Sequence, residues 1–177
     1  ENLVIGGAMT DPKGDRSKGP AEQDDPDLFT RIVAKDDKGI YVSGAKAHQT
    51  GCINSHWIIL MPTVRLTEND KDWAVVGAIP ADAKGVTYIY GRQSCDTRSM
   101  EEGTIDDGNA KYGGQEALMI LDRVFIPWDK VFMHGEYEFA AMLIERFTCY
   151  HRRSYVCKTG LGDVLIGAAA TIADYNG

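Results

Sequence analysis

The sequence lacks any run of about eighteen apolar residues, the length that a helix needs to cross a membrane. It also lacks, at its start, the charged segment and apolar stretch of a secretory leader. These absences predict a cytoplasmic protein without a membrane partner. The chain has no initiator Met and stops at Gly177 within a helical pattern, so we expect a fragment of a longer polypeptide.

Positive charge and cysteine are also scarce. The 177 residues include 19 Lys and Arg against 26 Asp and Glu, and the net charge of -7 argues against a nucleic-acid partner. Four cysteines at irregular spacing are too few for the disulfide framework of a secreted domain. We therefore expect reduced thiols, with Cys52 and Cys95 as small side chains in or near the core. With 44% hydrophobic residues, the chain can bury one ordinary core.

Apolar runs separated by turn residues predict a β-rich region that extends to about residue 132. A hairpin is expected where residues 30–34 and 40–46 flank an Asp-Asp-Lys-Gly turn. Further strands are predicted at residues 3–5, 56–61, 73–79, 86–90 and 118–127. Because strands recur at intervals of about a dozen residues, the pattern suits an antiparallel sandwich or barrel better than βαβ crossovers.

Two segments of this β-rich region carry polar groups able to face a ligand. The first strand runs into Gly6 and Gly7 and then into a polar turn at residues 10–20, which offers backbone N–H groups and hydroxyls. The alternative for this turn is an ordinary surface loop. Residues 47–55 place a dense set of hydrogen-bonding side chains between two strands. Both segments are candidates for contact with a polar ligand.

The helical part contains an unusual stretch at residues 145–158. It holds one histidine, two cysteines, two tyrosines and four cations in fourteen positions. Apolar residues at helical spacing flank it on both sides, so we predict two helices with a break around Ser154 that exposes these side chains to a site. The alternative for His151 is a core or surface histidine, and its spacing to Cys157 is not a zinc signature.

Six segments, taken together, resemble one enzyme family. They lie at residues 8–15, 45–51, 91–98, 125–127, 150–155 and 166–170. In this order they are similar to the 4-hydroxybutyryl-CoA dehydratase family, a branch of the 4-hydroxyphenylacetate 3-hydroxylase superfamily. The resemblance covers essentially the whole chain. It implies an α+β, acyl-CoA dehydrogenase-like fold, with an FAD-binding β-domain over residues 1–132 and the first helices of a C-terminal helical bundle over residues 133–177.

The resemblance also implies an activity for the whole protein, the conversion of 4-hydroxybutyryl-CoA to crotonyl-CoA with vinylacetyl-CoA isomerase as a companion activity. The thioester acidifies only the C2 hydrogen, so acid–base catalysis alone cannot remove the C3 hydrogen. Members of the family use a flavin radical mechanism, in which FAD takes up and returns an electron. A [4Fe-4S] cluster held by three cysteines and one histidine acts as a Lewis acid for the leaving hydroxyl. A homotetramer and an acyl-CoA substrate are expected.

Individual residues match the functional residues of this family. His151 and Cys157 match two cluster ligands, and two further cysteine ligands are expected upstream of this chain. The family has one more residue between this histidine and cysteine, which leaves Cys149 as the alternative ligand. The implied catalytic residues are His151, Glu116, Tyr155 and Lys158. The implied FAD-binding residues are Met9, Thr10 and Lys13 in the first polar segment and His48, Gln49 and Thr50 in the second.

Two other functions remain open. A monooxygenase of the 4-hydroxyphenylacetate type shares the fold and uses reduced flavin without iron. A non-catalytic binding domain would retain the fold without bound flavin or turnover. Iron content separates the first alternative from the dehydratase, which is expected to hold about four irons per subunit in a cubane cluster.

Overall fold

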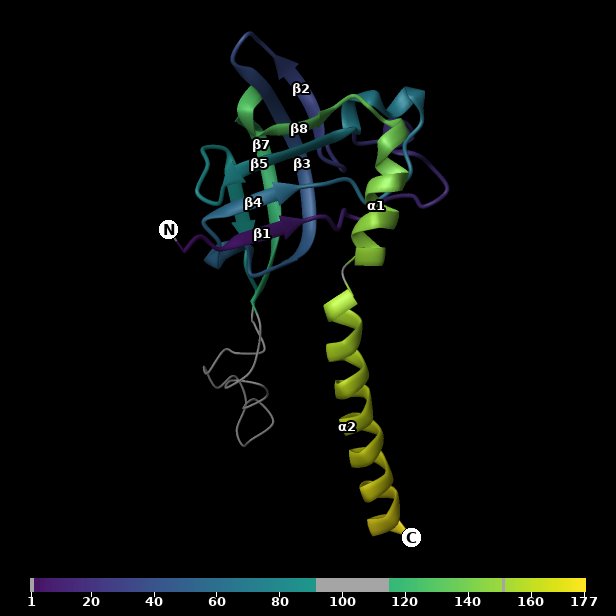
Figure 1. The fold of residues 1–177 in the computed structure, drawn as a ribbon. Coiled ribbons are helices and arrows are strands. Elements are labelled where there is room, and N and C mark those ends of the chain that lie inside the picture. The colour runs from purple at the N-terminus through teal and green to yellow at the C-terminus, as the bar shows by residue number, and fades with distance from the viewer. Residues whose placement is uncertain (1, 92–114, 151) are drawn as a thin grey trace. The chain divides into compact units, whose positions relative to one another are not determined.

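The structure is a computed structural model that describes residues 2–91, 115–150 and 152–177, with the backbone alone at residues 150 and 152–157. The chain divides into two compact units, Glu1–Ala141 and Met142–Gly177. The first unit contains the described strands, and the second is helical (Figure 1). The first unit also contains short 3-10 helices at Pro20–Glu22, Cys52–Asn54, Glu68–Trp73 and Trp128–Lys130.

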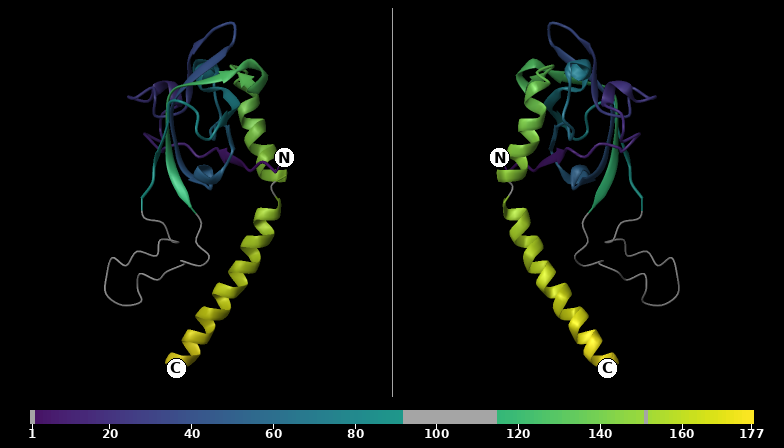
Figure 2. Two further views of the ribbon diagram at one scale, coloured as in Figure 1. Left: turned by 90° about the vertical axis from the view of Figure 1, so that its left-hand side faces the viewer. Right: turned by 90° about the vertical axis from the view of Figure 1, so that its right-hand side faces the viewer.

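The described strands form two sheets of four strands each. The first sheet has the order β1 (Ile5–Ala8), β4 (Trp57–Leu60), β5 (Val75–Pro80) and β8 (Val131–His134). The second sheet has the order β2 (Arg31–Lys35), β3 (Gly39–Thr50), β7 (Glu116–Pro127) and β6 (Val86–Ile89). β3 and β7 have 12 residues each and lie side by side in every view (Figure 1 and Figure 2).

Strand pairing departs in one place from the expected antiparallel pattern. β1 pairs with β4 in parallel, whereas the other described pairs of strands are antiparallel. Parallel pairing requires a long connection between the two strands, and the chain supplies one by building β2 and β3 of the other sheet before it returns to β4. The described strands form two separate sheets rather than one closed barrel, so the α+β class and the sandwich are confirmed.

One hydrophobic core holds the two sheets together. Both sheets contribute side chains with exposed fractions of 2% or less, namely Ile40, Val42, Met119, Leu121, Val124 and Ile126 from one and Ile58, Leu60, Val75 and Ile79 from the other. Buried residues of β7 alternate for most of its length with exposed or half-buried ones, as expected for a strand with one face in a core. Cys52 is buried in the same core, as predicted, and Cys95 lies outside the described residues.

The predicted hairpin is confirmed as β2 and β3. Its turn is closed by Asp36, whose carboxylate accepts hydrogen bonds from the backbone N–H groups of Lys38 at 2.8 Å and Gly39 at 3.1 Å. The Lys38 bond is the main cause that lowers the pKa of Asp36. A β-carbon on Gly39 would lie 2.1 Å from the Ile126 carbonyl oxygen, so β3 can approach β7 this closely only with glycine there.

Two helices follow the strands, α1 (Glu138–Tyr150) and α2 (Arg152–Asn176). The prediction of two helices is confirmed, but Ser154 lies within α2, so the predicted position of the break is wrong. Polar side chains are compatible with a helix when they point outward, which is why their crowding did not locate the break.

None of the helices in the described chain is both long and apolar enough to span a membrane.

Candidate functional site

The second polar segment lies at the end of β3, where the strand contains a bulge. Lys46 pairs with Met119 and Gln49 pairs with Ala117, so three steps along β3 match two along β7. His48, within the bulge, has a φ of 56°, a left-handed conformation that residues other than glycine seldom adopt. The extra residue allows both Lys46 and Gln49 to be buried while His48 is exposed.

On the buried face, the ammonium group of Lys46 connects three parts of the chain. It lies 2.6 Å from a carboxylate oxygen of Asp11, and it donates to the carbonyl oxygens of Met61 at 2.6 Å and Met9 at 3.3 Å. The side chains of Lys46 and Asp11 are 2% and 5% exposed. Burial lowers the pKa of Lys46, although the adjacent carboxylate opposes this shift.

The partner carboxylate is satisfied on its other side. Its second oxygen accepts hydrogen bonds from the hydroxyl of Thr63 at 2.6 Å and from the backbone N–H of Thr63 at 3.2 Å. A buried ion pair is tolerated when additional hydrogen bonds satisfy both groups, as they do here. The pair therefore fixes Asp11, in the segment after β1, against β3 and against the segment that follows β4.

Gln49 provides a second connection between the two polar segments. Its amide nitrogen donates to the carbonyl oxygen of Thr10 at 2.8 Å and to that of Ala47, and the backbone N–H of Ala47 also donates to Thr10 at 2.8 Å. Gln49 is 2% exposed. Its amide nitrogen is thus used inside the protein, where it holds the first segment beside the bulge.

The exposed face of the bulge brings together three of the predicted site residues. The hydroxyl of Thr50 donates to one carboxylate oxygen of Glu116 at 2.8 Å, and Thr50 and Glu116 are paired in the sheet. The other carboxylate oxygen of Glu116 lies 3.9 Å from Nδ1 of His48. The side chains of His48 and Glu116 are 82% and 51% exposed. An imidazole, a hydroxyl and a carboxylate are therefore presented together at one end of the sheet, where β3 ends and β7 begins.

The first polar segment contributes less exposed groups. Met9 and Thr10 are half-buried and use their carbonyl oxygens in the contacts with Lys46, Ala47 and Gln49, whereas Lys13 is exposed. Backbone and side-chain contacts therefore bring the predicted FAD-binding segments next to each other. The sequence indicated both segments but not the contacts that join them.

The predicted metal site is only partly described. His151 and the side chains of Tyr155 and Cys157 lie outside the described residues. Lys158 is exposed on α2, and Cys149 is exposed on α1. Among the residues with described side chains, no three of His, Cys, Asp or Glu are grouped so as to hold a metal ion.

Sequence reasoning missed Lys46, Asp11 and Thr63, the residues that hold the site from inside. Asp11 lies in the polar turn at residues 10–20, whereas Lys46 was assigned to the predicted strand at residues 40–46 and Thr63 to neither polar segment. A lysine within a strand is usually assigned to the solvent side, because buried lysines are rare. The sequence did contain a signal for this pair. Lys46 lies in a largely apolar strand, which allows burial of its side chain, and a buried cation requires an anionic partner such as Asp11 after β1.

A separate groove of about 560 Å³ is lined by Ile53, Ser55, His56, Ala81, Asp82, Val86 and Tyr88, none of which is a predicted site residue. The hydroxyl of Tyr88 donates to the carbonyl oxygen of Ala81 at 2.7 Å. Burial is the main cause that raises the pKa of Tyr88 to about 12. This phenol is therefore held in its neutral form and works as a hydrogen-bond donor.

Comparisons with known proteins agree with the architecture. Residues 1–133 match the family described as 4-hydroxyphenylacetate 3-hydroxylase N terminal. The chain is 64% identical, over 99% of its own length and 36% of the relative, to 4-hydroxybutyryl-CoA dehydratase/vinylacetyl-CoA-Delta-isomerase from Clostridium aminobutyricum. It is 32% identical, over 96% of its length and 32% of the relative, to 2,4,6-trichlorophenol monooxygenase from Cupriavidus pinatubonensis.

Among solved structures, an oxygen-tolerant archaeal 4-hydroxybutyryl-CoA dehydratase from N. maritimus matches with a TM-score of 0.84 and 93% identity, over 99% of this chain and 35% of that one. The oxygenase component of a 4-hydroxyphenylacetate 3-monooxygenase, solved with FAD, matches with a TM-score of 0.66 and 24% identity, over 78% and 28% of the two chains. The chain spans about a third of the length of the curated relatives it matches. Because the family model covers most of the sequence, the chain belongs to the 4-hydroxyphenylacetate 3-hydroxylase N-terminal family.

Proposed function

We propose that this chain is part of a 4-hydroxybutyryl-CoA dehydratase that also isomerises vinylacetyl-CoA. The observation that carries the proposal is the 93% identity to the N. maritimus dehydratase over 99% of the chain. Identity to the clostridial dehydratase is twice that to the trichlorophenol monooxygenase, at 64% against 32%. The same comparison favours an acyl-CoA substrate over a phenol.

FAD is the first cofactor in the proposal, and the exposed face of the bulge suits its polar edge. The Thr50 hydroxyl and the exposed His48 imidazole can form hydrogen bonds to heteroatoms of a flavin ring. The adjacent segment with Met9, Thr10 and Lys13 is held at a fixed distance by the Ala47 and Gln49 contacts to Thr10. When bound, FAD supplies the electron transfer that the thioester cannot.

Glu116, the first residue of β7, is the proposed proton-handling group at this end of the sheet. Its carboxylate is half exposed, accepts the Thr50 hydroxyl and lies near the His48 imidazole. The hydrogen bond from Thr50 orients one carboxylate oxygen, and the other faces the imidazole side. A carboxylate oriented in this way can hold or release a proton beside a substrate, which is the role that the reaction requires at C2 or C3.

An iron–sulfur cluster is the second cofactor in the proposal, and it rests on the sequence resemblance. His151 and Cys157 would be ligands together with two cysteines upstream, and Cys149 is the alternative to Cys157. When bound, the iron supplies a Lewis acid for the leaving hydroxyl. Tyr155 and Lys158 are proposed as supporting proton-handling and cationic groups.

The proposal extends to the organisation of the whole protein. We assign FAD binding to a β-domain over residues 1–132 and assign residues 133–177 to the start of a helical bundle. The complete enzyme is proposed to be a cytoplasmic homotetramer. Gel filtration with light scattering on the full-length protein measures the subunit number directly, and four subunits are expected.

The experiment that tests the function uses full-length protein purified without oxygen. We expect bound flavin, about four irons and four sulfides per subunit, and conversion of 4-hydroxybutyryl-CoA to crotonyl-CoA. His151→Ala should abolish turnover and reduce iron content while the circular dichroism spectrum is retained, and His56→Ala is the matched control. Flavin without iron, together with hydroxylation of a phenol, would favour the monooxygenase. A protein with neither flavin nor turnover would support the non-catalytic domain.

A further inference from the structure

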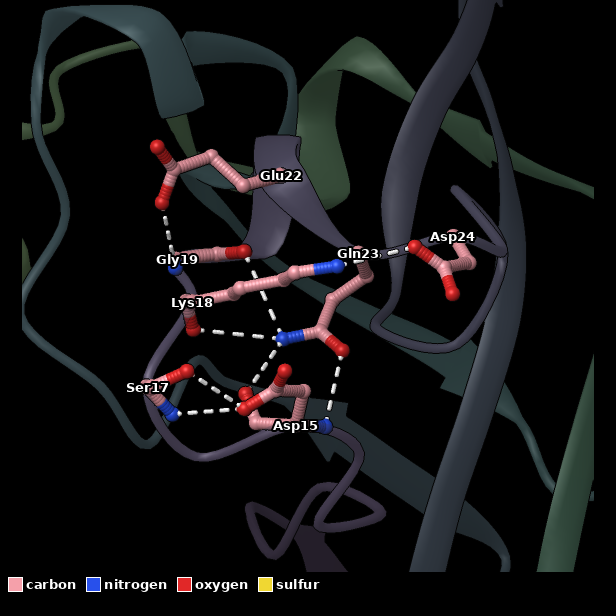
Figure 3. A network of polar contacts seen from close by, with 7 residues as sticks. All are labelled: Asp15, Ser17, Lys18, Gly19, Glu22, Gln23 and Asp24. Carbon is pink, nitrogen blue, oxygen red and sulfur yellow. Dashed lines mark hydrogen bonds and ion pairs between the residues drawn. The ribbon is translucent and has the colours of Figure 1, made fainter.

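Within the first polar segment, the loop at residues 13–19 is folded around one side chain, Gln23 (Figure 3). The amide nitrogen of Gln23 donates to the carbonyl oxygens of Asp15 at 2.8 Å, Lys18 at 3.2 Å and Gly19 at 3.5 Å. The amide oxygen of Gln23 accepts a hydrogen bond from the backbone N–H of Asp15 at 3.0 Å. A single amide thus satisfies backbone groups at both ends of the turn at residues 15–19.

The residues around Gln23 are adapted to this arrangement. Gly14 has a φ of 51°, and a β-carbon there would lie 2.5 Å from the amide oxygen of Gln23 and 2.3 Å from Leu28. The carboxylate of Asp15 accepts hydrogen bonds from the backbone N–H and the hydroxyl of Ser17, at 2.9 Å and 2.7 Å. The Ser17 hydroxyl bond is the main cause that lowers the pKa of Asp15. The loop is therefore ordered by its own contacts.

Both ends of this loop are attached to buried carboxylates. At one end, Asp11 is held by Lys46 and Thr63. At the other end, the backbone N–H of Ala21 donates to the carboxylate of Asp70 at 2.9 Å, and Asp70 is 3% exposed. Asp70 is fixed in turn by the hydroxyl and backbone N–H of Thr67, at 2.7 Å and 2.9 Å. Between these fixed ends, Gln23 makes four of the hydrogen bonds that order residues 15–19, beside those from Ser17 to Asp15.

We propose that Gln23 is a positioning residue for the flavin site. Its amide holds residues 13–19 in one conformation, and this conformation sets where Lys13 and the backbone after Thr10 meet the flavin. The inference rests on the proposed function, because the position of the loop matters to the flavin only if the adjacent segment binds it. Gln23 itself does not need to touch the ligand.

The test uses Gln23→Met in the full-length protein, because methionine has a similar length but none of the hydrogen bonds. Trypsin cleavage after Lys13, Arg16 and Lys18 measures opening of the loop, and flavin fluorescence titration measures binding. We expect cleavage at these sites to be at least about tenfold faster, since loss of a hydrogen bond shifts a local opening equilibrium by roughly this factor. The dissociation constant for flavin should rise about tenfold, and kcat at saturating flavin should stay within about twofold of the unmodified protein.

Asp24→Asn is the matched control, because its side chain is 96% exposed and its ion pair with Lys18 at 2.9 Å is a surface contact that contributes little to stability. Cleavage and flavin binding should both be unchanged in this variant. Faster cleavage of Gln23→Met with an unchanged flavin dissociation constant would overturn the positioning role and leave the proposed function standing. Unchanged cleavage would overturn the role of Gln23 in holding the loop. An unmodified protein that binds no flavin would overturn both the inference and the proposed function.

Discussion

Lys46 and His48 are two residues apart on β3, yet they occupy opposite environments. Lys46 is 1% exposed and forms an ion pair and backbone hydrogen bonds in the interior. The side chain of His48 is 82% exposed, and its Nδ1 lies 3.9 Å from Glu116. Regular β-structure would place these residues on the same face of the sheet, and the bulge separates them. One backbone irregularity thus creates a buried face that fixes the site and an exposed face available to a ligand.

The comparison is tested most severely by removing the buried cation. Lys46→Met should lower the free energy of unfolding by about 3–5 kcal/mol, because it leaves the carboxylate of Asp11 buried without a counter-charge. Urea unfolding of the variant measures this loss. The double variant Lys46→Met, Asp11→Leu should recover part of it, since no unpaired charge remains. A loss below about 1 kcal/mol in the single variant would show that the ion pair does not hold the buried face.

Gln49 allows a test of the buried face of the bulge in which the substituted side chain is uncharged. Gln49→Leu should lower the free energy of unfolding by about 1–3 kcal/mol, because the carbonyl oxygens of Thr10 and Ala47 lose a buried donor. Thermal unfolding measures the change. Asn69→Ala, at an exposed position, is the control and should stay within about 0.5 kcal/mol. Equal stabilities of the two variants would contradict the assignment of Gln49 to the interior.

Substitutions at His48 should have a smaller effect on stability, and the sign should depend on the backbone. His48→Gly should raise the free energy of unfolding by up to about 1 kcal/mol, because glycine adopts the positive φ without strain. His48→Val should lower it by a similar amount, since a β-branched residue is poorly suited to this conformation. Differential scanning calorimetry of both variants measures the difference. Identical melting temperatures would indicate that the bulge relaxes at no cost.

Tyr88, outside the bulge, provides a pH reference, with no effect expected near neutral pH. Its folded-state pKa of about 12 lies above the ordinary value near 10, so the folded state retains this proton longer than the unfolded state. Its contribution to stability is fully present below pH about 10 and is lost as the pH rises towards 12. Absorbance at 295 nm should show a late phenolate transition that Tyr88→Phe removes. A transition at the ordinary pKa would contradict the burial of this hydroxyl.

Local sequence signals predicted much of the fold. An apolar run located β7, and the Asp-Asp-Lys-Gly turn located the β2–β3 hairpin, because both are set by residues close in the sequence. The parallel pairing of β1 with β4 was missed, since it depends on a long-range connection. The short strand β8 was missed because a four-residue strand carries little periodicity.

The site was predictable to a lesser degree. The polar segments at residues 10–20 and 47–55 were identified from the sequence, and the structure joins them where Ala47 and Gln49 donate to Thr10. Burial of Lys46 and Gln49 was not predictable, because it depends on a bulge that inserts one residue into the alternation. The same composition without the bulge would have turned these side chains to different faces. The periodicity of the sequence does not reveal a bulge that changes the register of a strand, because tertiary contacts determine where the bulge lies.

The most direct test of the exposed face is a titration of flavin into the full-length protein carrying His48→Ala, with His56→Ala as the matched control. If the exposed face of the bulge binds the flavin, the dissociation constant should rise about tenfold for His48→Ala, equivalent to about 1.4 kcal/mol, and stay unchanged for His56→Ala. Melting temperatures without flavin should change little in either variant. Equal dissociation constants for the unmodified protein and the His48→Ala variant would contradict this account.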